Sequence, residues 1–173
     1  QSDSLIKLST ELLVLAQKEE GSLSELNSKL NEIVSSAIAL ESFTGESGKR
    51  VHVYGDASIK RVSVFGLGKE DKITSDGLRA LASKISAYVN SLKLESFSVD
   101  GDSFGLRNSD YAQAFSEGLV LGAYEFLDYK SKKKDSNTLN SVNILGDIDA
   151  SSITKGEVIA NGVAYARDLG NHP

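Results

Sequence analysis

The sequence predicts an α/β protein, a three-layer α/β/α sandwich built around a mixed sheet of roughly six strands. Two kinds of apolar spacing support this fold class: short runs with the length or alternation of strands, and longer stretches with apolar residues every three or four positions, as in helices. After a central pair of strands, helical and strand segments alternate along the 173 residues. Such alternation favours a sheet with helices on both faces.

The first third of the chain contains two strand-like runs and one helix. Residues 4–8 and 10–16 are short apolar runs, and the second includes Leu-Leu-Val-Leu-Ala, which is continuous enough for burial on both sheet faces. Ser22 and Glu25 have the spacing of a capping box, and apolar residues recur after them at helical intervals. We therefore expect a helix to begin at Ser22 and a polar loop to cover residues 43–49.

A pair of strands and a second helix follow. Residues 50–54 and 61–65 alternate polar and apolar side chains, as half-buried strands do. We predict that these two strands are neighbours joined by a loop. Thr74 and Asp76 then open a helix whose apolar residues keep helical spacing as far as Leu92.

The last third is predicted to contain two strands and two helices. Residues 94–99 and 142–145 are apolar runs of strand length. Thr154 and Glu157 have the spacing of a second capping box, which would open the final helix.

The longest predicted helix lies between those two strands. Ser109 can cap it, and its apolar stripe extends through Leu127. Gly118 and Gly122 lie four residues apart on this helix, so its backbone can approach a neighbour closely, although each glycine costs about 1 kcal/mol of helix stability. We expect a close helix contact there.

Two glycine-containing segments fail as ligand loops. Residues 65–69, Phe-Gly-Leu-Gly-Lys, follow a strand but lack the glycine spacing and the hydroxyl residue of a phosphate-binding loop, so we interpret them as a tight turn. Residues 100–105 resemble the start of a calcium loop, but Phe104 and Tyr111 stand where oxygen ligands are needed. Neither segment predicts a site.

The charge and composition exclude several classes of function. The formal net charge is −5, which argues against a general nucleic-acid or anionic-membrane partner. The chain has no cysteine, hence no disulfide or thiolate metal site, and no apolar run long enough to cross a bilayer. His52 and His172 belong to no metal-binding or nucleophile motif, and we assign no catalytic residue to the chain.

One dense cationic run, residues 129–134, follows the predicted long helix. A solvated loop after a helix C-terminus is the default interpretation, because positive charge is favoured there. A contact with an anion or a partner is the alternative, and it would use three lysines: Lys130, Lys132 and Lys133.

Three segments together resemble one family. Val62–Lys69 is similar to a "V…VGLGK" segment, Glu117–Lys133 to "EGxxLGxYxFxxYKSKK", and Ala166–Pro173 to "ARDLxNxPxNxxTP". They occur in the order found in the N-terminal domain of leucyl aminopeptidases, also called cytosol aminopeptidases.

This resemblance implies a macro-domain-like fold for about residues 1–150 and the start of a linker helix toward a catalytic domain in residues 151–173. The sequence ends within the third motif, so we expect the natural chain to continue. The family's metal ligands and catalytic residues lie further along the polypeptide, and the 173-residue chain alone is expected to be inactive. Four residues would belong to the interdomain linker: Arg167, Asp168, Asn171 and Pro173.

For the full-length protein, the resemblance implies a cytoplasmic metalloaminopeptidase that releases N-terminal amino acids from peptides. Two divalent cations (zinc, manganese or magnesium) would activate a water and polarise the scissile carbonyl. The N-terminal domain would support assembly of a homohexamer and access to the active site. Gly170 stands where the family usually has a larger apolar residue, which leaves the specificity and assembly of this member open.

Two alternatives remain. The implied fold is also similar to nucleotide-binding and ADP-ribose-binding macro-type modules, although residues 17–22 lack the asparagine-rich turn of those binders. An accessory domain that binds nucleic acid would use the lysine-rich run and would lose affinity steeply with added salt.

Overall fold

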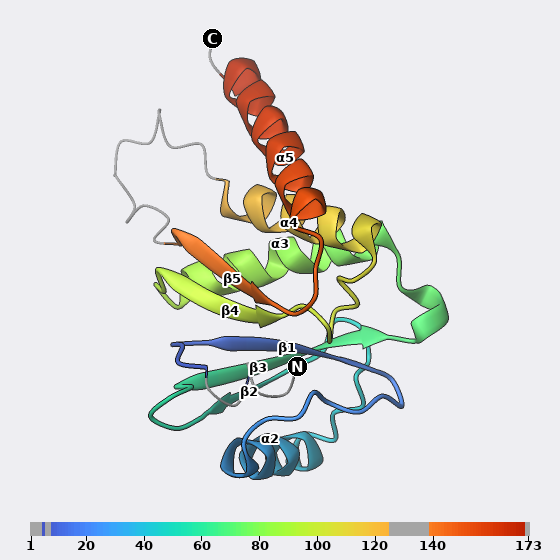
Figure 1. Cartoon of the computed structure of the whole chain (residues 1–173), viewed down its shortest axis with the longest axis vertical. Coiled ribbons are helices and arrows are strands. Elements are labelled where there is room, and N and C mark those ends of the chain that lie inside the picture. Colours follow the sequence, from blue (N-terminus) through green and yellow to red (C-terminus); the bar gives the residue numbers. More distant parts are fainter. Residues whose placement is uncertain (1–4, 6–7, 125–138, 172–173) are drawn as a thin grey trace. The chain divides into compact units, whose positions relative to one another are not determined.

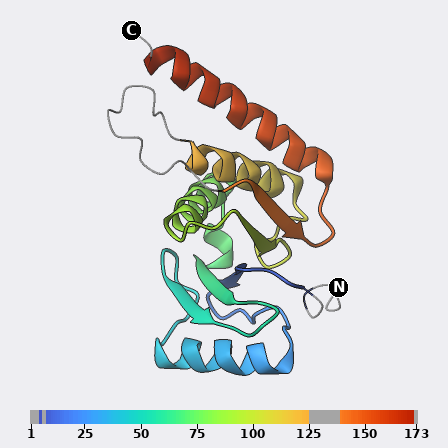
Figure 2. The same cartoon turned by 90° about the vertical axis from the view of Figure 1, so that its left-hand side faces the viewer.

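A computed structural model describes residues 5, 8–124 and 139–171. The chain divides into two compact units, each described by itself. Among the described residues, the first unit contains the β-sheet and the α-helix Ser28–Leu40, and the second contains the α-helices Ser75–Ser91, Ser109–Ala123 and Ala150–Asn171 (Figures 1 and 2). In the described part of the chain, no helix is long and apolar enough to cross a membrane.

The first unit is built on a five-stranded mixed sheet in the order β2-β3-β1-β4-β5. β2 runs antiparallel to β3, and the other neighbours are parallel. The predicted α/β class and mixed sheet are therefore confirmed, with five strands in place of six. The strands are β1 (Leu13–Lys18), β2 (Arg50–Tyr54), β3 (Arg61–Gly68), β4 (Ser96–Asp100) and β5 (Ser141–Leu145).

The expected strand over residues 4–8 is wrong for the residues described there. Leu5 is helical and Leu8 is irregular, and the amide of Leu8 donates a hydrogen bond to the carbonyl oxygen of Leu5 at 3.4 Å. Leu5 is buried in the core. A short apolar run fits a turn of helix as well as a strand.

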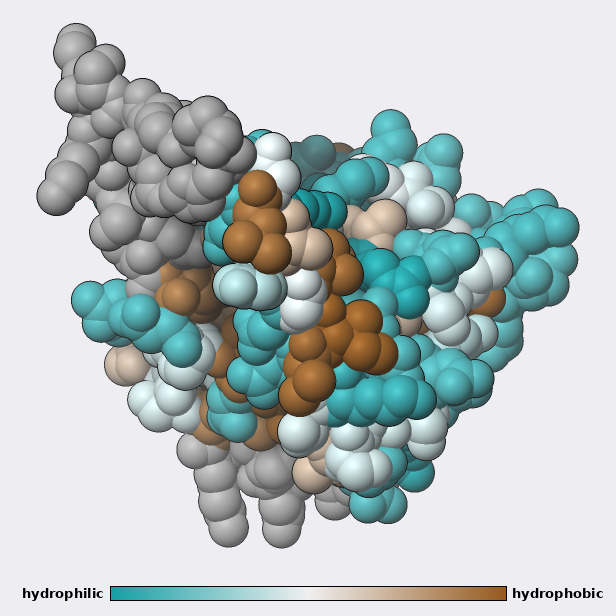
Figure 3. All heavy atoms as spheres, turned by 90° about the horizontal axis from the view of Figure 1, so that it is seen from above, coloured by the Kyte–Doolittle hydropathy of each residue, from teal (hydrophilic) through white to brown (hydrophobic). Residues whose placement is uncertain are grey.

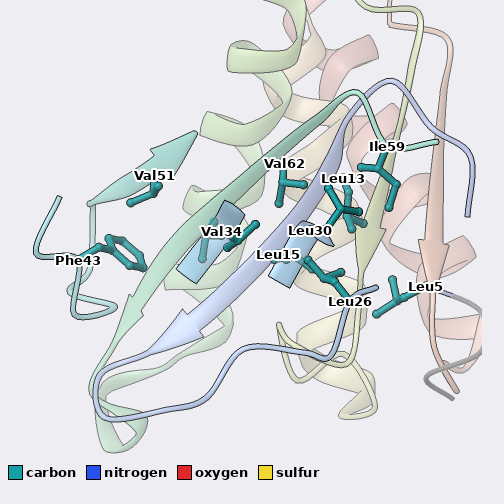
Figure 4. Packing of buried hydrophobic residues seen from close by; sticks show 11 residues of the cluster. Leu5, Leu13, Leu15, Leu26, Leu30, Val34, Phe43, Val51, Ile59 and Val62 are labelled. Atoms are coloured by element: carbon teal, nitrogen blue, oxygen red, sulfur yellow. The ribbon is translucent and has the colours of Figure 1, made fainter. Parts of the chain in front are cut away.

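β1 is buried along its continuous apolar run, as that run predicts. Each residue from Leu12 to Ala16 is at most 2% exposed. Leu13 and Leu15 belong to a core cluster with Leu30 and Val34 of α2 (Ser28–Leu40), and Figure 4 shows these side chains gathered between β1 and the helix. This hydrophobic cluster packs α2 against the sheet.

α2 begins six residues later than predicted. Its N-cap is Asn27, whose side-chain oxygen accepts a hydrogen bond from the amide of Leu30 at 3.0 Å. Asn31 bonds both the amide and the carbonyl of Leu26, which holds the residues before the helix in an extended path. The capping box predicted at Ser22 does not form.

The predicted pair of neighbouring strands is confirmed, and an aspartate organises the turn between them. The carboxylate of Asp56 accepts hydrogen bonds from the amides of Ser58 and Ile59 and from the Ser58 hydroxyl, at 2.7–3.0 Å. These bonds, with that from Ile59 first, lower the pKa of Asp56 to about 2. The turn is therefore held by an ionised carboxylate over the whole neutral range.

The second unit contains α3 (Ser75–Ser91), α4 (Ser109–Ala123) and α5 (Ala150–Asn171). Thr74 caps α3 as predicted. The cap of α4 is Asn108 in place of the predicted Ser109, because the Asn108 side chain accepts two backbone hydrogen bonds. α4 ends at Ala123, four residues before the predicted Leu127, because Tyr124 has extended backbone angles.

α5 begins at Ala150, earlier than the predicted second capping box. Asp149 accepts hydrogen bonds from the amide of Ser151 at 3.0 Å and from the hydroxyls of Ser151 and Ser152. Thr154 lies inside the helix, where its hydroxyl donates to the carbonyl of Ala150 at 3.0 Å. Threonine makes this bond within a helix, so the box motif alone did not locate the start.

The close helix contact predicted at Gly118 and Gly122 is confirmed. A Cβ added to Gly118 would lie 2.2 Å from the carbonyl oxygen of Arg79 on α3, and one added to Gly122 would lie 2.4 Å from that of Ser83. At Gly156 of α5, an added Cβ would lie 2.3 Å from a backbone carbonyl of α4. Glycine is therefore required at both helix contacts of α4, the one with α3 and the one with α5.

The first prediction concerns the cap of α2. Replacing Asn27 by Ala removes the side-chain acceptor for the Leu30 amide, so it should lower the free energy of unfolding by about 1 kcal/mol. Chemical denaturation measures this change. Ser22→Ala is the matched control: Ser22 is exposed and outside the helix, so its loss should be nearly neutral. Equal losses in the two variants would place the cap elsewhere.

The second prediction concerns the α3–α4 contact. Gly118→Ala should destabilise the protein by about 1–3 kcal/mol, because the new methyl group meets a backbone oxygen that cannot move aside alone. Gly162→Ala, at a helical position with open space around it among the described residues, should instead stabilise it by up to about 1 kcal/mol. Thermal unfolding of both variants tests the opposite signs.

Candidate functional site

Three of the four predicted linker residues lie in the last turns of α5. Arg167 and Asn171 are exposed, and Asp168 is half-buried. Pro173 lies outside the described residues. So do Lys130, Lys132 and Lys133, for which an anion or partner contact stays a prediction.

The end of α4 meets two of these linker residues. The phenol of Tyr124 donates a hydrogen bond to the carboxylate of Asp168 at 2.6 Å. The guanidinium carbon of Arg167 lies 5.7 Å from the centre of the Tyr124 ring, within cation–π range. Tyr124 therefore uses its hydroxyl and its ring face to bind consecutive residues of α5.

This contact favours the protonated, neutral form of the Tyr124 phenol. The hydrogen bond to Asp168 raises the pKa of Tyr124, and partial burial and the charge of Asp168 act in the same direction. Ionising the phenol would remove the donor and bring two negative charges together. The contact is therefore complete below about pH 10, the ordinary tyrosine value, and is lost as the pH rises through the higher pKa.

The first half of α5 is held on α4 by different contacts. The Ser116 hydroxyl donates to the carbonyl of Ile153 at 2.8 Å. Three residues of α5 are buried on this side, Ser152, Gly156 and Ala160, all small. Small side chains allow the two helices to lie close together, so α5 is bound to α4 both near its start and near its end.

The first unit has one notable cavity, of about 380 Å³, at the amino-terminal edge of the parallel strands. Hydroxyl groups line it, including those of Thr10, Ser58 and Ser98. Its charged residues, Lys60 and Glu11, form an ion pair with each other.

The prediction that residues 65–69 form a tight turn is wrong. β3 continues through Gly66 to Gly68. A Cβ on Gly66 would lie 2.0 Å from the carbonyl oxygen of Glu46, so the glycine serves an approach of the chain's own backbone.

The segment from Asp100 to Gly105 uses its carboxylates internally. Asp100, 3% exposed, accepts a hydrogen bond from the Ser24 hydroxyl, and burial raises the pKa of Asp100. Asp102 accepts two hydrogen bonds from the guanidinium of Arg107, at 2.8 and 3.2 Å. Both carboxylates therefore accept hydrogen bonds from side chains of the same unit.

His52 lies on β2 and is half-buried, with its Nδ1 2.9 Å from the Ser63 hydroxyl. Burial lowers its pKa, with the charges of Arg50 and Arg61 adding to the effect. The residue is therefore neutral near pH 7. Among residues 5, 8–124 and 139–171, no three His, Cys, Asp or Glu side chains come together as a metal-ligand set.

The Tyr124–Asp168 contact generates a prediction about titration. In Asp168→Ala, the phenol of Tyr124 should ionise at lower pH than in the unmodified protein, because both the acceptor and its charge are gone. Ultraviolet absorbance of tyrosinate against pH measures this shift. Tyr124→Phe identifies the transition that belongs to Tyr124. An identical titration in Asp168→Ala would disprove the contact.

Comparison with known proteins identifies the family. Residues 12–133 match the model described as "Cytosol aminopeptidase family, N-terminal domain". A probable cytosol aminopeptidase of Sulfurihydrogenibium sp. is 36% identical over 165 residues, covering 91% of this chain and 33% of the relative. One of Roseiflexus castenholzii is 30% identical over 178 residues, covering 97% and 35%. The chain thus spans about a third of the length of these relatives.

Solved structures agree on the fold. A tomato leucine aminopeptidase mutant superposes with a TM-score of 0.80 at 25% identity, over 100% of this chain and 38% of that one. The bottromycin maturation enzyme BotP in complex with Mn gives 0.72 at 21% identity, over 94% and 32%, which speaks for the fold alone. The chain belongs to the cytosol aminopeptidase family and contains its N-terminal domain.

Proposed function

We propose that this chain is the non-catalytic N-terminal portion of a metal-dependent leucyl aminopeptidase, a hydrolase that releases N-terminal amino acids from peptides. The observation that carries the proposal is the match of residues 12–133 to the family's N-terminal domain. The relatives are about three times as long, and their names describe an aminopeptidase activity of the longer proteins. The proposal extends that activity to the gene product that contains this chain.

In this proposal, two divalent cations (zinc, manganese or magnesium) bind in the catalytic part of the protein. The manganese complex of a structural neighbour supports a divalent metal in proteins with this domain. The described residues of this chain do not fit such a centre, since they contain no cluster of three candidate ligands. No step of peptide hydrolysis is assigned to them.

The proposed role of residues 151–173 is to connect the domain, residues 1–150, to the catalytic part. The hydrogen bond and the cation–π contact of Tyr124 support this role, because they hold Arg167 and Asp168 in place. Asn171 and Pro173 continue the linker in the proposal. The wider setting we propose is a cytoplasmic homohexamer, in which the N-terminal domain supports assembly and access to the active site.

The test uses the complete gene product and residues 1–173 side by side. The complete product should hydrolyse leucine p-nitroanilide with added manganese, and a chelator should abolish this activity until metal is restored. Residues 1–173 should show no turnover above background under the same conditions. Release of p-nitroaniline, followed by absorbance, measures both.

A catalytically dead variant is not needed as a control, because the metal-free complete product serves that purpose. Turnover by residues 1–173 would overturn the non-catalytic role. A complete product that remains inactive with manganese, zinc and magnesium would overturn the aminopeptidase assignment.

A further inference from the structure

α5 is unusual in having apolar residues on two opposite sides. Its inner side, with Gly156 and Ala160, packs on α4. Its most exposed apolar residues are Val158 at 66%, Tyr165 at 65% and Leu169 at 60%. A helix with apolar residues all round is normally buried. α4 covers only the inner side of α5, so the opposite apolar side stays exposed.

The exposed residues form a regular stripe. Val158, Gly162, Tyr165 and Leu169 follow one another at spacings of four, three and four residues, the spacing of a helix–helix seam. At about 100° per residue, this set lies opposite Gly156 and Ala160. We call these four residues the outer stripe.

The chemistry of the outer stripe indicates an apolar partner. From Val158 through Ala166 the helix has no charged residue, although exposed helix surfaces normally carry many. Gly162 leaves room for close approach, since an added Cβ would meet no described atom within 4 Å. Figure 3 shows apolar residues gathered among polar ones on the face seen from the α5 end.

We infer, on the basis of the proposed function, that the outer stripe is the docking seat for the catalytic part of the same polypeptide. The chain spans 33% of a relative with which it aligns over 91% of its own length, and the family model is that of an N-terminal domain. In such proteins about two thirds of the polypeptide lies beyond this domain, and α5 is the last described element of this chain. A covalently joined partner is present at a high effective concentration, so a narrow apolar stripe suffices to hold it.

The area of the outer stripe argues against a second copy of this chain as the occupant. Its exposed tyrosine, valine and leucine offer roughly 300–400 Å² per helix. Two copies would bury about 600–800 Å² in total, below the roughly 1,200 Å² at which stable interfaces begin. A tethered partner has no such threshold.

The experiment is photo-crosslinking in the complete gene product. Tyr165 is replaced by p-benzoylphenylalanine, which keeps an aromatic ring at an exposed site and therefore leaves the fold intact. Tyr54 on β2, 75% exposed, is replaced in the same way as the matched control. After irradiation, mass spectrometry of peptides identifies the crosslinked partner and the yield.

The expected result is crosslinking from position 165 to peptides beyond residue 173, with at least ten times the yield found at position 54. Crosslinks from position 165 to peptides within residues 1–173, from the same chain or from a second copy, would show that this part of the chain covers the stripe and would overturn the inference. A yield equal to that at position 54 would show an uncovered stripe and also overturn it.

Peptidase activity of the same two proteins separates this inference from the proposed function. A product that hydrolyses leucine p-nitroanilide but does not crosslink contradicts only the docking seat. A product that crosslinks beyond residue 173 but hydrolyses nothing with any of the three metals contradicts only the aminopeptidase assignment.

Discussion

The arrangement of the second unit depends on direct contact between helix backbones at three glycines. A Cβ at Gly118, Gly122 or Gly156 would lie 2.2–2.4 Å from a backbone carbonyl oxygen of the neighbouring helix. A backbone oxygen cannot rotate away as the end of a long side chain can, so the glycines determine how near α3 and α5 come to α4. Helix packing at this distance excludes other side chains from the seam and leaves large residues on the outside.

Within the same unit, one buried ion pair adds a directional contact to the close packing. The guanidinium of Arg79 donates to the carboxylate of Glu117 at 2.6 Å, and the Gln113 amide donates to the other oxygen of that carboxylate at 2.8 Å. The Glu117 side chain is buried, so its charge requires both donors. Since Glu117 precedes Gly118, the pair and the glycine contact position the same turn of α4 on α3.

The sequence predicted the elements whose signal is local and strong. The unbroken apolar run of β1, the Thr74 cap and the two glycines of α4 were all read correctly, because burial, capping and close approach each restrict residue type. The helix starts predicted at Ser22 and Thr154 are wrong, because a capping box is a pattern of only two residues. The first amides of these helices donate instead to a nearby side chain, Asn27 or Asp149.

Local sequence patterns could not predict where β3 ends or which residue contacts Arg167 and Asp168. β3 continues through two glycines because its neighbours supply hydrogen bonds and space, which a propensity rule would take for a break. Arg167 and Asp168 were found through a family motif, but their partner Tyr124 lies 44 residues from Asp168, and no periodicity connects them. Only the packing of α5 on α4 brings the three together.

The polar and apolar sides of α5 have complementary effects on its orientation. The backbone contact at Gly156 limits rotation of α5 about its axis, because a rotation would bring a residue with a Cβ against the carbonyl oxygen of α4. The hydrogen bond and the cation–π contact of Tyr124 are directional, and a rotation of one residue, about 100°, would remove both Arg167 and Asp168 from it. The Tyr124 contacts and the Gly156 contact together determine which side of α5 faces α4, and the outer stripe lies on the opposite side. A helix oriented in this way can present one apolar surface to one partner, which is what the proposed connection between two parts of the protein requires.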